Sequence, residues 1–170
     1  ITFIYIRHEI VILRLKISIR SIPFIKVFVV AFIWSAVTIF PQLIDINNWT
    51  NNYNWQWLAL ERFFYILAIT LMFDIRDLHH DPKKLHTFPQ RIGIGATKWL
   101  SVVFLFISLI SLFNLNISST RLVRVLLVYL ISLFMIYYSE PDKDDIYYTG
   151  WFDGIIGLHA LAIIGLSLWP

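Results

Sequence analysis

Residues 63–95 read FFYILAITLMFDIRDLHHDPKKLHTFPQRIGIG, an apolar run that ends abruptly in the longest polar stretch of the chain. Charged side chains at the mouth of an apolar run are costly unless they reach water or have a function. The polar part, residues 73–95, gathers three carboxylates, several cations and three of the five histidines. We therefore predict that an apolar helix delivers a functional loop to a membrane surface, and that the rest of the chain is scaffold.

The composition is typical of a membrane protein. Of the 170 residues, 58% are hydrophobic and only 15% are charged, whereas a soluble domain contains about 25% charged residues. The net charge of +3 is too small to indicate a nucleic-acid partner. Cysteine is absent, which excludes disulfides and thiolate metal sites.

Five apolar stretches have the composition and approximate length of membrane-spanning helices. They cover residues 25–44, 57–73, 96–113, 122–138 and 150–168. The predicted fold is therefore all-α: a polytopic transmembrane helix bundle of about five spans.

The first residues are expected to differ from these spans. Residues 1–5 indicate the stump of a further helix, and residues 11–20 indicate an interfacial segment, because open strand edges are not tolerated in lipid. We expect one integral-membrane domain over residues 1–170. Because residue 1 is not methionine, this domain is expected to be the C-terminal portion of a longer protein.

The distribution of lysine and arginine predicts the orientation. Cations are concentrated in residues 14–26 and 76–98 and are absent from the loop between the first two spans. Cytoplasmic loops carry the excess of Lys and Arg. The Asp-rich loop is therefore predicted to be cytoplasmic, together with the acidic loop at residues 140–145.

Asp74, Asp77 and Asp81 are spaced at i, i+3 and i+7, so on a helix they would lie on one face. Carboxylates that share a face repel one another unless a cation lies between them. Hard oxygen ligands suit Mg²⁺ or Mn²⁺, which bind one or two carboxylates together with substrate phosphates. The three aspartates are therefore predicted to hold a metal ion that bridges to a diphosphate.

Cations surround these carboxylates in the sequence. Arginine matches phosphate geometry with a planar fork, and lysine supplies a point charge. The residues predicted to bind the diphosphate are Arg76, Lys83, Lys84 and Arg91.

Two other interpretations of this loop remain open. It could be a solvated connection whose basic residues only set the membrane orientation. Alternatively, His79, His80 and Asp81 could bind iron or zinc.

The order of residues resembles the second Asp-rich motif of the UbiA superfamily of intramembrane prenyltransferases. That motif has the form D-x-x-D-x-x-x-D, followed by Thr-x-Pro and a glycine. Here these positions hold the three aspartates and then Thr87, Pro89 and Gly93. Weaker similarities occur at residues 22–26 with Trp34, and at Tyr148 with Asp153 and Gly154. The resemblance extends from about residue 20 to the end.

The sequence also departs from the family pattern. Leu85 and His86 occupy the positions where the family usually has Gly and Lys, which could alter the loop turn and one diphosphate contact. Nothing in the chain matches the family's first Asp-rich motif.

The resemblance implies a Mg²⁺-dependent transfer of an isoprenyl group from a prenyl diphosphate to a hydrophobic or aromatic acceptor. The acceptor could be an aromatic ring, a quinone precursor, a porphyrin or a lipid. Asp77 and Asp81 are the expected catalytic residues. The isolated chain is expected to be inactive, with no acidic loop opposite its Asp-rich loop.

A non-catalytic membrane protein, such as a carrier or an assembly subunit, is the alternative. A carrier is expected to place polar groups in the middle of its spans. The sequence has few charges there, which favours the prenyltransferase. Glu61 and Arg62 are assigned to the start of a span, and His159 is interpreted as a packed, hydrogen-bonded side chain.

Overall fold

The computed structural model describes residues 24–44, 55–79, 86–115 and 117–164. In these ranges the chain forms five α-helices and no strand, in the order α2 (Ile25–Ile44), α3 (Trp55–Arg76), α4 (Phe88–Phe113), α5 (Ser119–Tyr138) and α6 (Asp153–Ile164). A 3₁₀ turn, η3 (Asp77–His79), follows α3, and a π-helical segment, η5 (Tyr147–Phe152), precedes α6. The all-α prediction is confirmed for this part of the chain.

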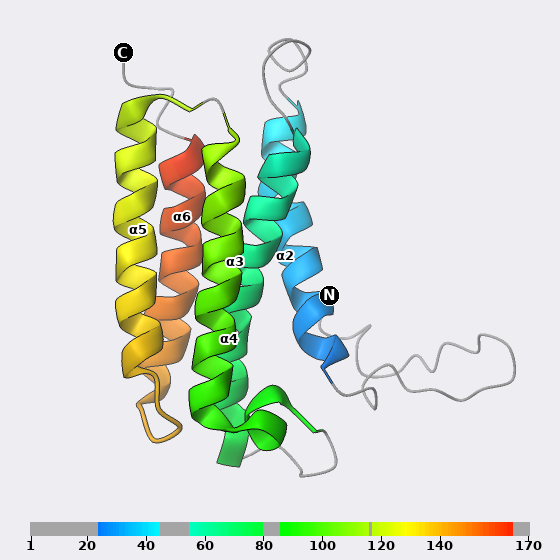
Figure 1. Ribbon diagram of the computed structural model, residues 1–170, viewed down its shortest axis with the longest axis vertical. Coiled ribbons are helices and arrows are strands. Elements are labelled where there is room, and N and C mark those ends of the chain that lie inside the picture. Colours follow the sequence, from blue (N-terminus) through cyan, green and yellow to red (C-terminus); the bar gives the residue numbers. More distant parts are fainter. Residues whose placement is uncertain (1–23, 45–54, 80–85, 116, 165–170) are drawn as a thin grey trace, which may run out of the picture.

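The helices lie side by side, and each runs opposite in direction to the next (Figure 1). As a result, the beginnings of α2, α4 and α6 and the ends of α3 and α5 lie at one end of the bundle. The Asp-rich region is at this end. The predicted helix stump and interfacial segment lie outside the described residues.

The helix boundaries agree with the apolar stretches to different degrees. The first predicted span coincides with α2, and the second and fourth lie within α3 and α5. α4 begins at Phe88 and not at residue 96, because Thr87 occupies its N-cap position and Pro89 lies in its first turn. The fifth stretch forms η5 and α6, which is described as far as Ile164.

By length and composition, α4 and α5 can each cross a membrane. The apolar part of α2 is shorter and covers Ile25–Phe40. α3 is long, but it contains Glu61 and Arg62 near one end and Asp74 and Arg76 near the other. The structure thus supports two membrane-length helices in the described part of the chain.

Two serine hydroxyls set the register of the antiparallel α3–α4 pair. Ser101 Oγ donates to the carbonyl oxygen of Ala68 at 2.7 Å, and Ser108 Oγ lies 2.7 Å from the carbonyl oxygen of Glu61. The two contacts are seven residues apart on both helices, which is about two helical turns. Small side chains allow two helix backbones to approach closely, and hydroxyls can bond across the contact.

The inner and outer faces of α4 differ in polarity. Its buried residues include Thr97, Ser101 and Ser108, whereas beyond its first turns its exposed large side chains are apolar. The exposed apolar positions recur at helical spacing: Trp99, Val103, Phe106, Ile110 and Phe113. A helix facing water shows the opposite pattern, with polar residues outside.

A glycine kink separates the first turn of α4 from its main part. Gly93 has φ 82° and ψ 161°, a conformation that is essentially restricted to glycine. The hydroxyl of Thr97 donates to the carbonyl oxygen of Gly93 at 2.8 Å. The glycine at this motif position therefore has a backbone role.

Gly150 and Gly154 are four positions apart, a spacing of small residues that favours close helix packing, but the structure does not show such packing. A Cβ atom added at Gly154 would meet nothing within 4 Å, and one at Gly150 would meet only Ile146 of the adjacent turn, at 3.6 Å. The described helices therefore do not pack closely against this pair.

Candidate functional site

Asp77 lies between two cations at the end of the bundle that carries the Asp-rich region. Arg76 Nε donates to Asp77 Oδ1 at 2.7 Å, and Lys26 Nζ is 3.7 Å from Asp77 Oδ2. Lys26 belongs to the first turn of α2, so the contact joins α2 to the end of α3. Asp74, one turn earlier in α3, is only 3% exposed. The structure thus brings two of the predicted metal ligands and one predicted phosphate-binding residue into one region.

Acidic residues from α5–η5 and α6 also approach this region. Asp77 raises the pKa of Arg76 through their hydrogen bond, and the charges of Asp145 and Asp153 act in the same direction. Asp142 Oδ1 lies 3.7 Å from Nε2 of His79. The expectation that no acidic loop would lie opposite the Asp-rich loop is therefore wrong. We call the end of the bundle at which Lys26, Arg76, Asp77, Asp145 and Asp153 lie the acidic end.

Other predicted site residues are placed differently. Arg91 is exposed in the first turn of α4, and its guanidinium carbon lies 5.5 Å from the ring centre of Phe24. Among the described residues, no three Asp, Glu or His side chains are grouped so as to hold a metal ion. Predicted residues outside the described ranges are Asp81, Lys83, Lys84 and His80. The three-aspartate site and the histidine alternative both remain predictions.

The α-helix that was expected to carry the aspartates ends before Asp77. α3 stops at Arg76, and Asp77 begins the 3₁₀ turn η3. The i, i+3 relationship between Asp74 and Asp77 therefore crosses a helix end, where the chain tightens.

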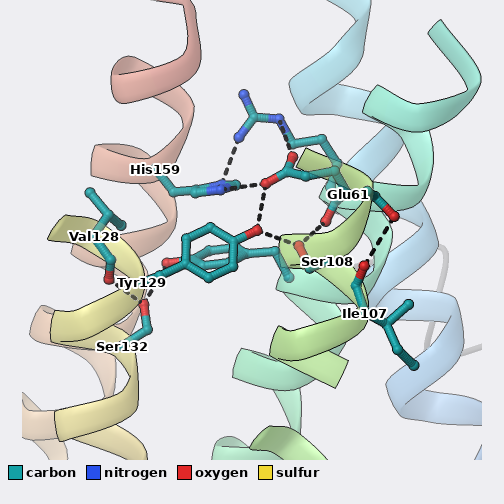
Figure 2. Close-up of polar contacts among 10 residues, drawn as sticks. Glu61, Ile107, Ser108, Val128, Tyr129, Ser132 and His159 are labelled. Carbon is teal, nitrogen blue, oxygen red and sulfur yellow. Dashed lines mark hydrogen bonds and ion pairs between the residues drawn. The ribbon is translucent and has the colours of Figure 1, made fainter. Parts of the chain in front are cut away.

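A second polar cluster lies inside the bundle and joins four helices (Figure 2). Nε2 of His159 is 2.8 Å from Oε1 of Glu61, and the hydroxyl of Tyr129 donates to the same oxygen at 2.8 Å. Ser108 contacts both the Tyr129 hydroxyl and the Glu61 carbonyl oxygen. Glu61 is fully buried, and His159 is 1% exposed. The buried carboxylate of Glu61 is therefore contacted by groups from α5 and α6, and Ser108 of α4 contacts the backbone carbonyl oxygen of the same residue.

Arg62 completes this cluster. Its Nη1 lies 2.6 Å from Nδ1 of His159, and its side chain is 1% exposed. A guanidinium can only donate hydrogen bonds, so Nδ1 of His159 accepts. The remaining ring proton is then on Nε2, which faces Glu61. His159 is therefore a neutral bridge between a buried cation and a buried anion.

An aromatic ring packs against the imidazole of His159. The ring of Tyr65 stacks on His159, with centroids 3.6 Å apart and planes at 11°. The Tyr65 hydroxyl is 2.8 Å from Oγ of Ser132 on α5. The imidazole is thus held by stacking on its ring face and by the contact of its Nδ1 with Arg62.

Sequence reasoning recognised His159 as packed and hydrogen-bonded but did not connect it with Glu61 and Arg62. The available signal was an adjacent Glu–Arg pair followed by the apolar run of α3, together with a lone histidine in the apolar α6. Taken alone, neither the Glu–Arg pair nor the histidine indicates a partner elsewhere in the chain. Only the antiparallel arrangement of the helices brings them together.

No family model, curated protein or solved structure matches this chain. The fold defines the class: the described part of the chain is all-helical, and two of its helices are long and apolar enough to cross a membrane. The UbiA resemblance rests on the sequence motif alone.

Proposed function

We propose that this chain is an integral-membrane prenyltransferase component that binds a prenyl diphosphate at its acidic end. The observation that carries the proposal is Asp77 between Arg76 and Lys26, within a motif that resembles the UbiA pattern. Carboxylates for a metal ion and cations for phosphate oxygens are the two sets of groups that a metal–diphosphate complex needs.

The proposed location is a lipid bilayer, with several spans and the acidic end on the cytoplasmic side. The apolar outer faces of the helices support it. On α5 the exposed side chains include Val123, Leu127, Leu130, Phe134 and Tyr137. A bilayer covers such a surface, whereas water would leave it as a large exposed apolar area.

The residues at the acidic end suit Mg²⁺ or Mn²⁺, because aspartate supplies hard oxygen ligands. Asp74 and Asp77, with Asp81, would hold the ion, which when bound neutralises charge on a departing diphosphate. The pairing of Asp77 with Arg76 and Lys26 keeps both cations at the site before substrate arrives. Arg76, with Lys83, Lys84 and Arg91, would then orient the phosphate oxygens. Asp77 and Asp81 are the proposed catalytic residues, and the acceptor is hydrophobic or aromatic.

Binding of radiolabelled farnesyl diphosphate to the purified protein, with and without Mg²⁺, tests the proposal. We expect Asp77→Asn to reduce the Mg²⁺-dependent binding at least about tenfold, because the metal loses a charged ligand. Asp144→Asn is the matched control, since Asp144 is exposed in the α5–η5 loop. Equal binding by the wild type and Asp77→Asn, or equal weakening by both variants, would reject the site.

The carrier alternative gains support from the buried cluster. The sequence placed Glu61 and Arg62 at the start of a span, and the structure buries them against His159 inside the bundle. Buried ionisable groups between membrane helices are typical of transport pathways. A carrier would lose uptake of its substrate in Glu61→Gln, whereas the prenyltransferase would retain Mg²⁺-dependent diphosphate binding in that variant.

A further inference from the structure

Three buried polar atoms of the Glu61–Arg62 pair have no hydrogen-bond partner among the described residues. They are Oε2 of Glu61 and Nε and Nη2 of Arg62. Both side chains are at most 1% exposed, so bulk solvent does not reach these atoms. Oε2 and Nε are 3.9 Å apart, which is too long for a hydrogen bond.

The rest of the cluster fixes where these three atoms point. Oε1 of Glu61 accepts from the Tyr129 hydroxyl and lies 2.8 Å from Nε2 of His159, and Nη1 of Arg62 donates to Nδ1 of His159. Neither side chain can turn to satisfy its free atoms without giving up these contacts. Buried polar atoms of this kind ordinarily bind a water molecule or another small group.

The free atoms define the chemistry of that group. Oε2 requires a hydrogen-bond donor, and Nε and Nη2 require an acceptor. A hydroxyl group is both donor and acceptor in a single oxygen. The charges of Glu61 and Arg62 balance, so a bound ion would leave a net charge in a dry interior, at high cost. A neutral hydroxyl fits both requirements.

We propose that Glu61 and Arg62 form a binding site for one hydroxyl oxygen, which donates to Oε2 of Glu61 and accepts from Arg62. The hydroxyl belongs either to an internal water molecule or to a phenol or alcohol that enters from the lipid. A separation of 3.9 Å between Nε and Oε2 suits one bridging oxygen.

This site is separate from the acidic end and does not depend on the proposed function. Glu61 precedes Asp74 by 13 positions on the continuous helix α3. At about 1.5 Å per residue, the two carboxylates are roughly 20 Å apart along the helix. A failure of diphosphate binding would therefore not contradict the hydroxyl site. A failure of the hydroxyl site would likewise not contradict diphosphate binding.

The test uses the full chain, labelled with ¹⁵N-arginine, in phosphatidylcholine bicelles. The Nε–H resonance of Arg62 is assigned through its loss in Arg62→Lys, and cross-relaxation from this proton is then recorded. We expect a cross-peak to water in the protein alone. A second sample contains saturating 4-propylphenol.

The phenol sample identifies the source of the hydroxyl. If the cross-peak to water persists and the unfolding temperature does not change, the site holds water. If the water cross-peak is replaced by one to the phenol, and the unfolding temperature rises with phenol concentration, the site accepts a lipophilic hydroxyl. Both results support the site.

Absence of a cross-peak to either hydroxyl would overturn the proposal, and this result is obtained on the wild-type protein without any risk of misfolding. Tyr129→Phe is the control for a signal relayed by the Tyr129 hydroxyl, which donates to Oε1 of Glu61. The cross-peak should survive this substitution. Its loss would assign the signal to Tyr129 and would also overturn the proposal.

Discussion

Nη1 of Arg62 lies 2.6 Å from Nδ1 of His159, although 97 positions separate the two residues. This contact joins α6 to α3, and the opposite nitrogen of the same imidazole faces Glu61 at 2.8 Å. A cation and an anion thus share one neutral histidine between them. The cluster is balanced in charge, and removal of one charged member leaves the other without compensation.

Glu61→Gln is expected to lower the free energy of unfolding by about 3–5 kcal/mol, because Arg62 then remains as an unpaired buried charge. The double variant Glu61→Gln/Arg62→Gln should lose less than the sum of the two single variants, since no charge remains. Unfolding of the purified protein in mixed detergent micelles measures both effects.

Glu140→Gln is the control for this experiment, because the Glu140 side chain is exposed outside the cluster. It should change the free energy of unfolding by no more than about 0.5 kcal/mol. If the losses in the two single variants simply add in the double variant, Glu61 and Arg62 do not act as a pair.

The positions of the helices could largely be predicted from the sequence, because apolar composition and length decide them. α2 has the predicted limits, whereas α4 begins earlier than its apolar stretch. The residues that extend α4 interrupt the apolar pattern with Pro89, Gln90, Arg91 and two glycines, and Thr87 precedes them as the N-cap. A hydropathy average does not detect these residues, although Thr87 and Pro89 are recognisable in the sequence as signals of a helix start.

The candidate sites were predictable to different extents. Asp74, Arg76 and Asp77 are close in sequence, so their proximity followed from local spacing. The approach of Lys26 and Asp145 to the same region depends on how α2 and the α5–η5 loop pack. The Glu61–His159 contact is likewise a product of tertiary packing, and no local pattern predicts it.

Gly93 and Gly95 provide a matched pair for testing the kink in α4. A Cβ atom at either position would meet nothing within 4 Å, so packing does not distinguish them. Gly93 has a positive φ of 82°, whereas Gly95 has no such φ. We expect Gly93→Ala to lower the free energy of unfolding by about 1–3 kcal/mol through backbone strain.

Gly95→Ala should be neutral or stabilise by up to about 1 kcal/mol, because alanine restricts the unfolded chain and favours helix. Thermal or denaturant unfolding of the two variants under identical conditions makes the comparison. Similar effects of both substitutions would show that the backbone at Gly93 is not strained when a side chain is added.

The ends of α5 offer the sharpest test of membrane topology. Ser118 and Lys143 are both exposed, and they lie beyond opposite ends of α5. The helix has 20 residues, or about 30 Å at 1.5 Å per residue, which equals the thickness of the hydrocarbon core. The chain has no cysteine that would compete for a thiol reagent.

In intact cells, an impermeant thiol reagent should label Ser118→Cys and should leave Lys143→Cys unlabelled until the membrane is permeabilised. The reason is that Lys143 follows the end of α5, which lies at the same end of the bundle as the beginnings of α2 and α4 and the end of α3 (Figure 1). These helix ends carry Lys26, Arg91 and Arg76, and cations mark the cytoplasmic side. Arg91→Cys, at the same end, should behave as Lys143→Cys does. Labelling of Ser118→Cys and Lys143→Cys from the same side would show that α5 does not cross the membrane. The reverse pattern would show that α5 crosses the membrane with the acidic end outside. That result would contradict the orientation predicted from the cation distribution.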